Sequence, residues 1–495
     1  MSVPELERDK TEPRSTPSSF TERSRPSFSL RPLVMRMHFY AGILVAPFLV
    51  LATISGGLYA MAPTIEQIVY RDYLHVDSTG PAVPVSEQVR AAQDVRPDLT
   101  VTAVRPAAEP GETTRVLFDD PSLGESERLA VFIDPVTAQS TGELVSYGSA
   151  AALPVRAWIS QLHRNLHLGE PGRIYSELAA SWLWVIALGG VYLWVARYRA
   201  ARRRSRSTAG LWTVDRSSRG RRRTLSWHGV AGIWIAAALV FLSTTGLTWS
   251  KYAGENIGEV RSALSWTTPT IDTTLTDATP KAAKAAKAGH EGHGASSEHT
   301  ADPSMVDGNI DRLDAVLDVA RANGVTGAVE AAIPSDVATA FTVEQTRQPW
   351  QFSAGKIAVD GRHGDVTDAS PFSEWPLAAK LTTWGIALHM GILFGLVSQV
   401  ALVVLAAALM SVIIRGYVLW WRRRPTRGTQ RMGRAPMRGT LRGVHPAATI
   451  AVVVGVVAVG YAIPLLGMSL AAFLVVDYLA GVVSRTRGTK PAPGH

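Results

Sequence analysis

Cysteine is absent from this sequence of 495 residues, and charged residues are few. The absence of cysteine excludes disulfides, thiolate zinc sites, iron–sulfur clusters held by thiolates and covalently attached c-type haem. Metal or redox chemistry in this chain therefore depends on its 12 His, its 10 Met and its carboxylates. Charged residues make up 18% of the chain and hydrophobic residues 46%, and the hydrophobic residues gather in long runs.

These apolar runs predict membrane-spanning helices. A helix of about 20 apolar residues crosses the roughly 30 Å of hydrocarbon in a bilayer. The last run is interrupted by Pro464 and Gly467, so it predicts a tight helical hairpin rather than one long helix. The expected spans are residues 34–62, 174–197, 226–250, 380–421, 446–463 and 465–483. The expected fold is a polytopic α-helical membrane protein embedded in the lipid bilayer, because only helices satisfy their own backbone in such segments.

The distribution of charge predicts which side of the membrane each connection faces. The connections 198–225 and 422–443 are rich in Arg, and the second holds no acidic residue. Segment 63–160 has 14 acids and 7 bases, and segment 251–376 has 18 acids and 10 bases. By the positive-inside rule, the Arg-rich loops are cytoplasmic and the two long segments are extracytoplasmic. The net charge of +9 is therefore a topology signal and predicts no nucleic-acid partner.

Both ends of the chain are expected in the cytoplasm. Residues 1–30 are rich in Ser, Thr, Pro, Arg and Glu, which predicts a disordered tail, and residues 484–495 form a second tail. The first apolar run is too long and begins too late for a cleavable signal peptide. The sequence thus predicts a multi-pass protein with its N- and C-termini on the cytoplasmic side.

The two extracytoplasmic segments repeat one order of elements. Each shows a helical pattern followed by three β-type runs and a turn led by an Asp, either Asp134 or Asp360. We expect one α+β domain in 63–160 and a second in 306–370. The expected helices are 85–95 and 310–323, and the expected strands are 100–104, 114–118, 129–133, 328–333, 340–343 and 356–359. Between the domains, residues 265–305 predict a disordered stretch that carries His290, His293 and His299.

The membrane core also reads as two copies of one unit. A shift of 190 residues places the first span on the third, with His38 on His228. A shift of 226 residues places the second span on the fourth, with His163 on His389. Glycines and tryptophans match under the same shifts: Gly42 on Gly232, Gly56 on Gly246, Gly190 on Gly416 and Trp194 on Trp420. We therefore expect a four-helix core built from two internal repeats, followed by the additional C-terminal hairpin.

The four aligned histidines are the candidate site. An ionisable residue in or beside a membrane helix is costly, so it is a functional candidate, although a single His can also anchor a helix end at the interface. His38 and His228 are expected at the cytoplasmic side, and His163 and His389 at the outer side. Two imidazoles on opposite sides of a macrocycle are the ligands of a low-spin b-type haem. The pattern therefore predicts two haems b at different depths, although the glycines also fit plain close packing of helices.

Three further residues surround the outer pair. His167 follows His163 by four positions, so on one helix both would face the same way. We expect His163 to be the ligand and keep His167 as the alternate ligand or a neighbour of the site. Arg164 and Arg173 are candidates for contacts with haem propionates, and ordinary interfacial arginines are an equal interpretation.

At this point the sequence resembles a known family, the PepSY-associated transmembrane proteins, which include iron-regulated membrane proteins and ferric-siderophore reductases of bacteria. The resemblance covers about residues 31 to 425. The motifs that carry it are Arg36-Met-His38-Phe-Tyr-Ala-Gly42, Gln161-Leu-His163-Arg-Asn-Leu-His167-Leu-Gly-Glu-Pro-Gly172-Arg173, Trp227-His228-Gly-Val-Ala-Gly232 and Leu388-His389-Met-Gly391-Ile-Leu-Phe-Gly395.

The resemblance implies two PepSY-like outer domains and a place in the bacterial cytoplasmic membrane. Reductases of this kind carry two b-haems between four helices and pass electrons outward to a ferric chelate. This implies that His38, His163, His228 and His389 are the haem ligands and that the chain is a membrane oxidoreductase. No nucleotide-binding domain is fused to this chain, so the electron donor is expected to be separate, either membrane quinol or a cytoplasmic reductase.

Two other functions remain open from the sequence. The first is a non-redox membrane protein whose outer modules bind or regulate an extracytoplasmic protease or peptide. The second is metal capture by His290, His293 and His299, for which a short spacing in a disordered loop is weak support. No nucleophile–base arrangement, phosphate-binding loop or HExxH motif is present in the sequence, so other enzyme classes receive no support.

Overall fold

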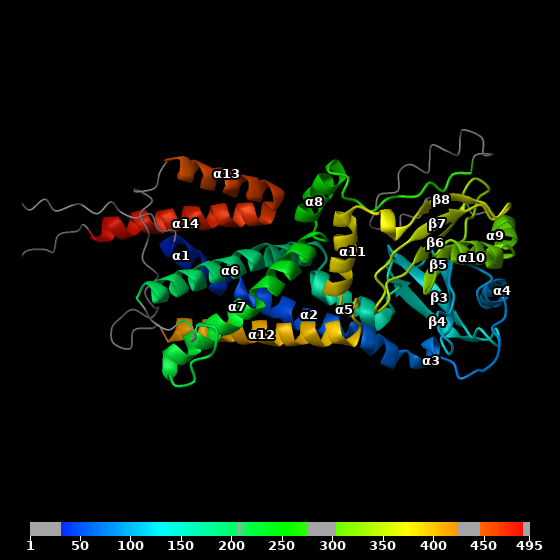
Figure 1. Cartoon of the computed structure of the whole chain (residues 1–495), viewed down its shortest axis with the longest axis horizontal. Coiled ribbons are helices and arrows are strands. Elements are labelled where there is room, and N and C mark those ends of the chain that lie inside the picture. Colours follow the sequence, from blue (N-terminus) through cyan, green and yellow to red (C-terminus); the bar gives the residue numbers. More distant parts are fainter. Residues whose placement is uncertain (1–30, 205–207, 209–210, 276–302, 423–445, 489–495) are drawn as a thin grey trace, which may run out of the picture.

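The protein is an elongated molecule with a helical bundle at one end and an α+β part at the other (Figure 1). The computed structural model describes residues 31–204, 208, 211–275, 303–422 and 446–488. Within these residues, four helices are long and apolar enough to cross a membrane: α2 (Ala46–Val69), α6 (Glu170–Arg203), α7 (Gly220–Leu247) and α12 (Leu396–Trp421). The predicted class, a multi-pass helical membrane protein with α+β soluble parts, is confirmed.

The first expected span, 34–62, is divided into two helices. Helix α1 (Arg31–Leu44) leads into α2 through Val45, and Pro47 lies in the first turn of α2. Proline has no backbone N–H, so it leaves the carbonyl of Ile43 without its helical donor. The hydroxyl of Tyr417, on α12, donates to that carbonyl over 3.0 Å. A side chain from the fourth span thus satisfies the break in the first.

The fourth expected span, 380–421, is also divided, and here the sequence prediction of one long helix was wrong. Helix α11 (Leu377–His389) stands across the bundle, and α12 begins only at Leu396 (Figure 1). Its counterpart α5 (Pro154–Asn165) is likewise a short separate helix before α6. Gly169 and Gly395, which precede α6 and α12, share one conformation, with φ 60° and ψ −133° in the first and φ 53° and ψ −134° in the second. Glycine alone adopts this conformation without strain, so the two breaks are encoded at matching positions.

The two outer domains form one continuous antiparallel sheet rather than two separate ones. The strand order is β4-β3-β2-β1-β5-β6-β7-β8, and the two halves join where β1 pairs with β5, with Ala103 opposite Ala332. The strands are β1 (Thr100–Arg105), β2 (Thr114–Asp119), β3 (Glu127–Ile133), β4 (Ser140–Tyr147), β5 (Val329–Ala332), β6 (Phe341–Gln345), β7 (Lys356–Val359) and β8 (Val366–Ser370). Six of these strands match the expected ranges within about two residues.

The two remaining strands lie at the edges of the sheet. Both Asp-led turns, at Asp134 and Asp360, continue into a fourth strand, β4 or β8, where no further strand was expected. These edge strands are polar and largely exposed, so they lack the alternating apolar pattern that identifies a strand.

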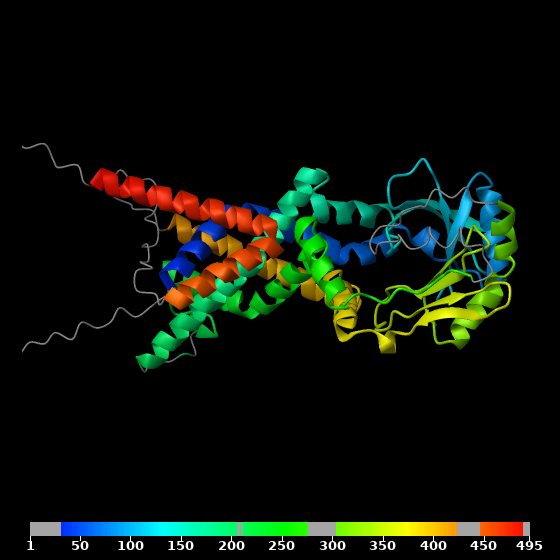
Figure 2. The same cartoon turned by 90° about the horizontal axis from the view of Figure 1, so that it is seen from above.

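Helices cover one face of the sheet and leave the other face toward the bundle (Figure 2). Helix α4 (Val85–Val95) packs with α9 (Pro303–Ile310) and α10 (Leu313–Ala322) over a core that includes Phe118 and Phe341. The second helical pattern, expected as one helix over 310–323, is α10, and α9 precedes it in residues where no helix was expected. The remaining short elements are α3 (Arg71–Leu74), α8 (Tyr252–Ala263) and η3 (Phe372–Glu374). The opposite face of the sheet holds a smaller apolar cluster around Leu117 and Phe132, together with charged residues.

The C-terminal hairpin lies along the bundle (Figure 1). Helix α13 (Pro446–Ala462) and α14 (Pro464–Gly488) meet where Gly460 faces Gly467 so closely that a methyl group at Gly467 would lie 2.7 Å from the Gly460 Cα. Trp182 of α6 donates to Ser469 over 2.9 Å and ties α14 to the bundle. Both helices have apolar stretches shorter than the four spans, so their crossing of the membrane stays a prediction.

Candidate functional site

His38 and His228 face each other at the end of the bundle far from the sheet, and we call them the distal pair. His38 lies on α1 and His228 on α7, with their ring centroids 6.2 Å apart. The Nδ1 of His38 is 3.0 Å from the carbonyl of Ile186, and the Nδ1 of His228 is 3.1 Å from the carbonyl of Val412. A carbonyl only accepts, so each Nδ1 donates.

His163 and His389 form the corresponding sheet-side pair. They lie on α5 and α11, the short helices before the spans. The expected span 380–421 had included His389. The Nδ1 of His163 is 3.0 Å from the hydroxyl of Ser55, and the Nδ1 of His389 is 2.6 Å from that of Thr245.

The hydroxyl protons at the sheet-side pair are already used. Ser55 donates to the carbonyl of Leu51 over 2.8 Å, and Thr245 donates to that of Phe241 over 2.8 Å. With that proton on the backbone carbonyl, each hydroxyl accepts from the imidazole, and Nδ1 donates here as well. In the described residues, no hydrogen bond reaches the Nε2 of any of the four histidines. This arrangement, with one ring nitrogen oriented by a donor bond and the other free, is typical of metal-ligating histidine.

A glycine lies under each imidazole. A methyl group added at Gly190 would lie 3.3 Å from His38 Cε1, and one at Gly416 would lie 3.7 Å from His228 Cε1. At the sheet-side pair, Gly56 would place it 3.0 Å from His163 Cε1, and Gly246 would place it 3.7 Å from His389 Cε1. A methyl group at Gly56 or Gly190 would crowd the ring, whereas one at Gly246 or Gly416 would make an ordinary van der Waals contact.

The contacts at the two pairs repeat with the offsets found in the sequence. The carbonyl acceptors Ile186 and Val412 differ by 226 residues, as do Gly190 and Gly416. The hydroxyl acceptors Ser55 and Thr245 differ by 190. Sequence reasoning did not single out Ser55 or Thr245, although the 190-residue shift that aligns the histidines also aligns these two hydroxyls.

The space around the pairs fits a flat macrocycle. A metal–imidazole bond of about 2 Å on each side places two trans imidazole centroids roughly 6 Å apart, which matches the 6.2 Å of the distal pair. A methyl group at Gly42 or Gly232, four residues after the distal histidines, would meet no atom within 4 Å. All four histidines are half-buried. The distal pair therefore fits a haem between its two rings, and the sheet-side pair offers the same ring nitrogens.

Aromatic residues flank the sheet-side pair. The ring of Tyr59 stacks on His163 with centroids 6.0 Å apart and planes 9° apart. Trp249 meets His389 edge-on at 5.5 Å. Sequence analysis assigned neither Tyr59 nor Trp249 to the site.

His167 does not share a face with His163. Helix α5 ends at Asn165, and Leu166 and His167 both adopt positive φ, so the chain turns between the two histidines. His167 is exposed, its ring stacks on Trp158 at 4.9 Å, and its Nε2 is 3.0 Å from the Trp158 carbonyl. The expectation of one helical face was wrong because the helix ends before the second His.

The two candidate arginines both have protein partners. Arg164 donates to the hydroxyl of Tyr147 over 3.1 Å, and Arg173 pairs with Glu170 at 3.6 Å. His290, His293 and His299 lie outside the described residues. Within the described part of the chain, no group of three or more His, Asp or Glu side chains is placed to hold a metal ion.

Comparison with known families gives one match. The model of the PepSY-associated TM region matches residues 35–423, which is most of the chain and includes all four histidines. No curated protein matches the chain. The chain belongs to the PepSY-associated transmembrane family, as the sequence motifs predicted.

Proposed function

We propose that this PepSY-associated membrane protein carries electrons across the bilayer through two b-type haems to an acceptor on the sheet side. The observation that carries this proposal is the repeated arrangement of the four histidines, each with Nδ1 donating and Nε2 free. Packing alone does not require the same tautomer at four sites from four different helices. A pair of neutral imidazoles with free Nε2 atoms is the donor set that bis-histidine haem ligation needs.

The chain's own residues prepare both sites before any cofactor binds. The tautomer and direction of each ring are fixed by its hydrogen-bond partner, which is Ile186, Val412, Ser55 or Thr245. Such partners raise the basicity of the ligating nitrogen and hold the ligand in place. Each bound haem would supply a one-electron iron couple. Because cysteine is absent, this couple does not depend on thiolates.

The spacing of the two pairs fits transfer through the hydrocarbon layer. His38 of the distal pair and Ser55, which contacts His163, lie 17 positions apart along α1 and α2, as do His228 and Thr245 along α7. At 1.5 Å per residue this is about 25 Å, close to the thickness of the hydrocarbon core. The two pairs therefore connect opposite regions of the membrane.

The direction and partners follow from charge and chemistry. The Arg-rich connection that follows α6 joins the distal end of the bundle, which by the positive-inside rule supports a cytoplasmic distal end and an extracytoplasmic sheet. A separate donor, quinol or a cytoplasmic reductase, would deliver electrons to the distal pair. The acceptor would be a ferric siderophore or another ferric chelate, because reduction to iron(II) weakens binding by hard oxygen ligands and releases the metal.

An absorption spectrum tests the proposal. Purified full-length protein should show a b-type spectrum that changes on reduction and returns when a ferric chelate is added. His38→Ala and His389→Ala should each lose part of this signal, whereas His167→Ala should keep all of it. A well-folded, colourless protein from cells supplied with haem would contradict the proposal and leave a non-redox role in binding a peptide or protease.

A further inference from the structure

A row of charged side chains crosses the face of the sheet that looks toward the bundle. Arg115 on β2 is opposite Arg105 on β1, Glu330 on β5 is opposite Glu344 on β6, and Glu344 is opposite Lys356 on β7. The pairing of β1 with β5 brings Arg105 beside Glu330, so the row is continuous. Side chains of a strand that point away from the apolar core share one face, so these charges point toward the bundle.

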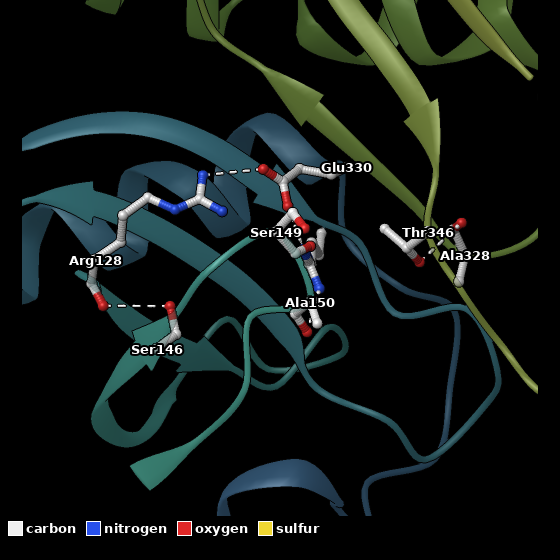
Figure 3. A network of polar contacts seen from close by, with 8 residues as sticks. Arg128, Ser146, Ser149, Ala150, Ala328, Glu330 and Thr346 are labelled. Atoms are coloured by element: carbon white, nitrogen blue, oxygen red, sulfur yellow. Dashed lines mark hydrogen bonds and ion pairs between the residues drawn. The ribbon is translucent and has the colours of Figure 1, made fainter. Parts of the chain in front are cut away.

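Glu330 neutralises only part of this positive charge. It pairs with Arg105 at 2.5 Å and with Arg128 at 2.9 Å, and Figure 3 shows Arg128 extended toward it. Arg105 also donates to the carbonyls of Ser149, over 2.8 Å, and Ala150. Burial raises the pKa of Glu330, but the two arginines outweigh it and hold this pKa below its ordinary value.

Arg115 is held among other positive charges without an acidic partner in contact. In the described residues its guanidinium forms no hydrogen bond or ion pair and lies 5.6 Å from the ring centroid of Phe132. Burial, aided by the charges of Arg105 and Arg156, lowers the pKa of Arg115 to about 10, although Glu66 acts in the opposite direction. The guanidinium of Arg115 remains charged at neutral pH, and no acidic side chain in contact compensates for its charge.

Arg347 extends this positive region toward the sheet-side pair. The side chain of Arg347 is exposed, and its electrostatic neighbours are Glu344, Tyr59 and Arg156. Tyr59 is the residue that stacks on His163. Arg347 also has no hydrogen bond or ion pair in the described part of the chain.

Arg156 connects Arg115 with Arg347. It is a neighbour of both Arg115 and Arg347, and its side chain is only 11% exposed. Its one acidic contact, Glu66, is 3.5 Å away, and the other oxygen of Glu66 accepts the Leu153 N–H over 2.7 Å. Glu66 therefore compensates for one arginine at most.

The loop that carries Arg347 is fixed to the bundle beside a pocket. The backbone of Trp350 donates to the carbonyl of Leu393 over 2.8 Å, and Trp384 of α11 donates to that of Phe352 over 2.8 Å. The pocket is lined by Arg347, Trp384 and Leu393, close to the end of α11 where His389 lies. A ligand held by Arg347 would thus lie close to the sheet-side pair.

We propose that Arg115, Arg156 and Arg347, the arginine cluster, bind an anionic ferric chelate whose outer groups are carboxylates or phenolates. The guanidinium fork matches such oxygens, and a bound anion relieves the repulsion among three crowded cations. This inference rests on the proposed function, since it names the acceptor's charge class. Haem propionates share the carboxylate chemistry, so the test must separate them from the chelate.

The first test measures binding without electron transfer. Gallium(III) citrate, which is redox-inert, is titrated calorimetrically into the full-length protein. Arg115→Gln and Arg347→Gln should each weaken binding about tenfold, as expected for loss of one charge-assisted contact, and Arg115→Lys should restore part of it. Arg90→Gln is the matched control, because Arg90 pairs with Asp311 among the helices on the opposite face of the sheet. Equal affinity in all variants would overturn the proposal.

The second test compares acceptors of opposite charge. Chemically reduced protein is mixed with ferric citrate or with hexaammineruthenium(III), and haem oxidation is followed by absorbance. The variants should slow oxidation by the anionic chelate about tenfold and leave the cationic acceptor unaffected, with haem content unchanged. Loss of haem in Arg347→Gln with unaltered gallium citrate affinity would show that the cluster holds propionates and would overturn the proposal. A colourless protein with cluster-dependent gallium citrate binding would contradict the proposed electron transfer alone.

Discussion

The distal and sheet-side histidine pairs have the same tautomer but obtain it from different partners. His38 and His228 donate to backbone carbonyls, whereas His163 and His389 donate to hydroxyl groups. A carbonyl partner is present whatever the side chain at that position. A hydroxyl partner depends on one residue, so the sheet-side pair is the more easily altered by mutation and by evolution.

The surroundings of the two pairs differ as well. Near the distal pair, Arg415 lies over the ring of Trp227 at 5.0 Å, and Arg36 is buried over Tyr40. Aromatic rings flank the sheet-side pair instead. The two halves of the core thus share the arrangement of the histidines and differ in its surroundings, as would suit the two proposed electron-transfer centres.

Removal of a ligand should have the largest effect and should separate the two sites. We expect His38→Ala to remove the distal haem and His389→Ala the sheet-side haem, because one imidazole is lost from each bis-histidine site. Each variant should retain about half of the b-type absorbance, and the double variant should retain none. His167→Ala, with its ring on Trp158, is the control. Loss of all absorbance in one single variant of a folded protein would mean that the pairs are not independent.

Removal of the hydroxyl partners should affect the sheet-side pair alone. Ser55→Ala and Thr245→Val delete the acceptors of His163 and His389, and loss of such a partner weakens metal-site affinity by about 10- to 100-fold. Transfer of haem to excess apomyoglobin, followed by absorbance, should be faster for half of the haem only. Ser243→Ala, whose hydroxyl donates to the Ala180 carbonyl between α7 and α6, is the matched control. Equal effects at both pairs would show that dependence on hydroxyl partners does not set the sheet-side pair apart from the distal pair.

The glycines offer a smaller and graded test. Gly56→Ala places a methyl group 3.0 Å from the His163 ring, whereas Gly246→Ala leaves 3.7 Å to His389. We expect Gly56→Ala to cost about 1–3 kcal/mol at its site, a typical result of overpacking, and Gly246→Ala to be tolerated. Thermal loss of the b-type spectrum measures both. A greater effect from Gly246→Ala would show that the closeness of the rings to their glycines does not limit the sites.

The sheet should show a pH-dependent stability to which Glu330 contributes. Because the native pKa of Glu330 is depressed, its pairing stabilises the sheet above the ordinary Glu pKa of 4.5, and this contribution is lost as pH falls through the native pKa. Glu330→Gln should therefore destabilise the sheet at pH 7, and the difference from the natural protein should shrink below pH 4.5. Hydrogen exchange of β5 measures this.

The control for that experiment is Glu143→Gln, which breaks the more exposed pair with Arg96 at 3.4 Å. Surface pairs contribute less than about 1 kcal/mol, so this variant should behave like the natural protein. A pH profile for Glu330→Gln that runs parallel to that of the natural protein would show that Glu330 is not a main source of the acid sensitivity.

Much of the fold could be predicted because its signals are local. The spans follow from the length of apolar runs, and the inner strands follow from alternation. The break between α11 and α12 was missed because residues 390–395 are also apolar, and only the positive φ of Gly391 and Gly395 reveals the turn. The joining of the two domains through β1 and β5 was missed because pairing between distant strands leaves no local signal.

The candidate site likewise combines residues that the sequence could predict with residues that only the folded structure brings together. The histidines and their glycines could be predicted because the internal repeat aligns them. Ser55 and Thr245 were missed because a hydroxyl in an apolar helix commonly bonds to its own backbone, and only the contact between helices shows a second role. The arginine cluster joins residues from β2, α5 and the loop after β6, and only the folded sheet brings these together.

The most direct test of the central claim is the ratio of haem to protein, from a pyridine haemochrome assay and amino-acid analysis of the full-length protein. We expect two haems b per chain, one at each histidine pair. A ratio of one would contradict the equivalence of the two pairs, and a ratio of zero in protein from haem-supplied cells would contradict the proposed electron transfer itself.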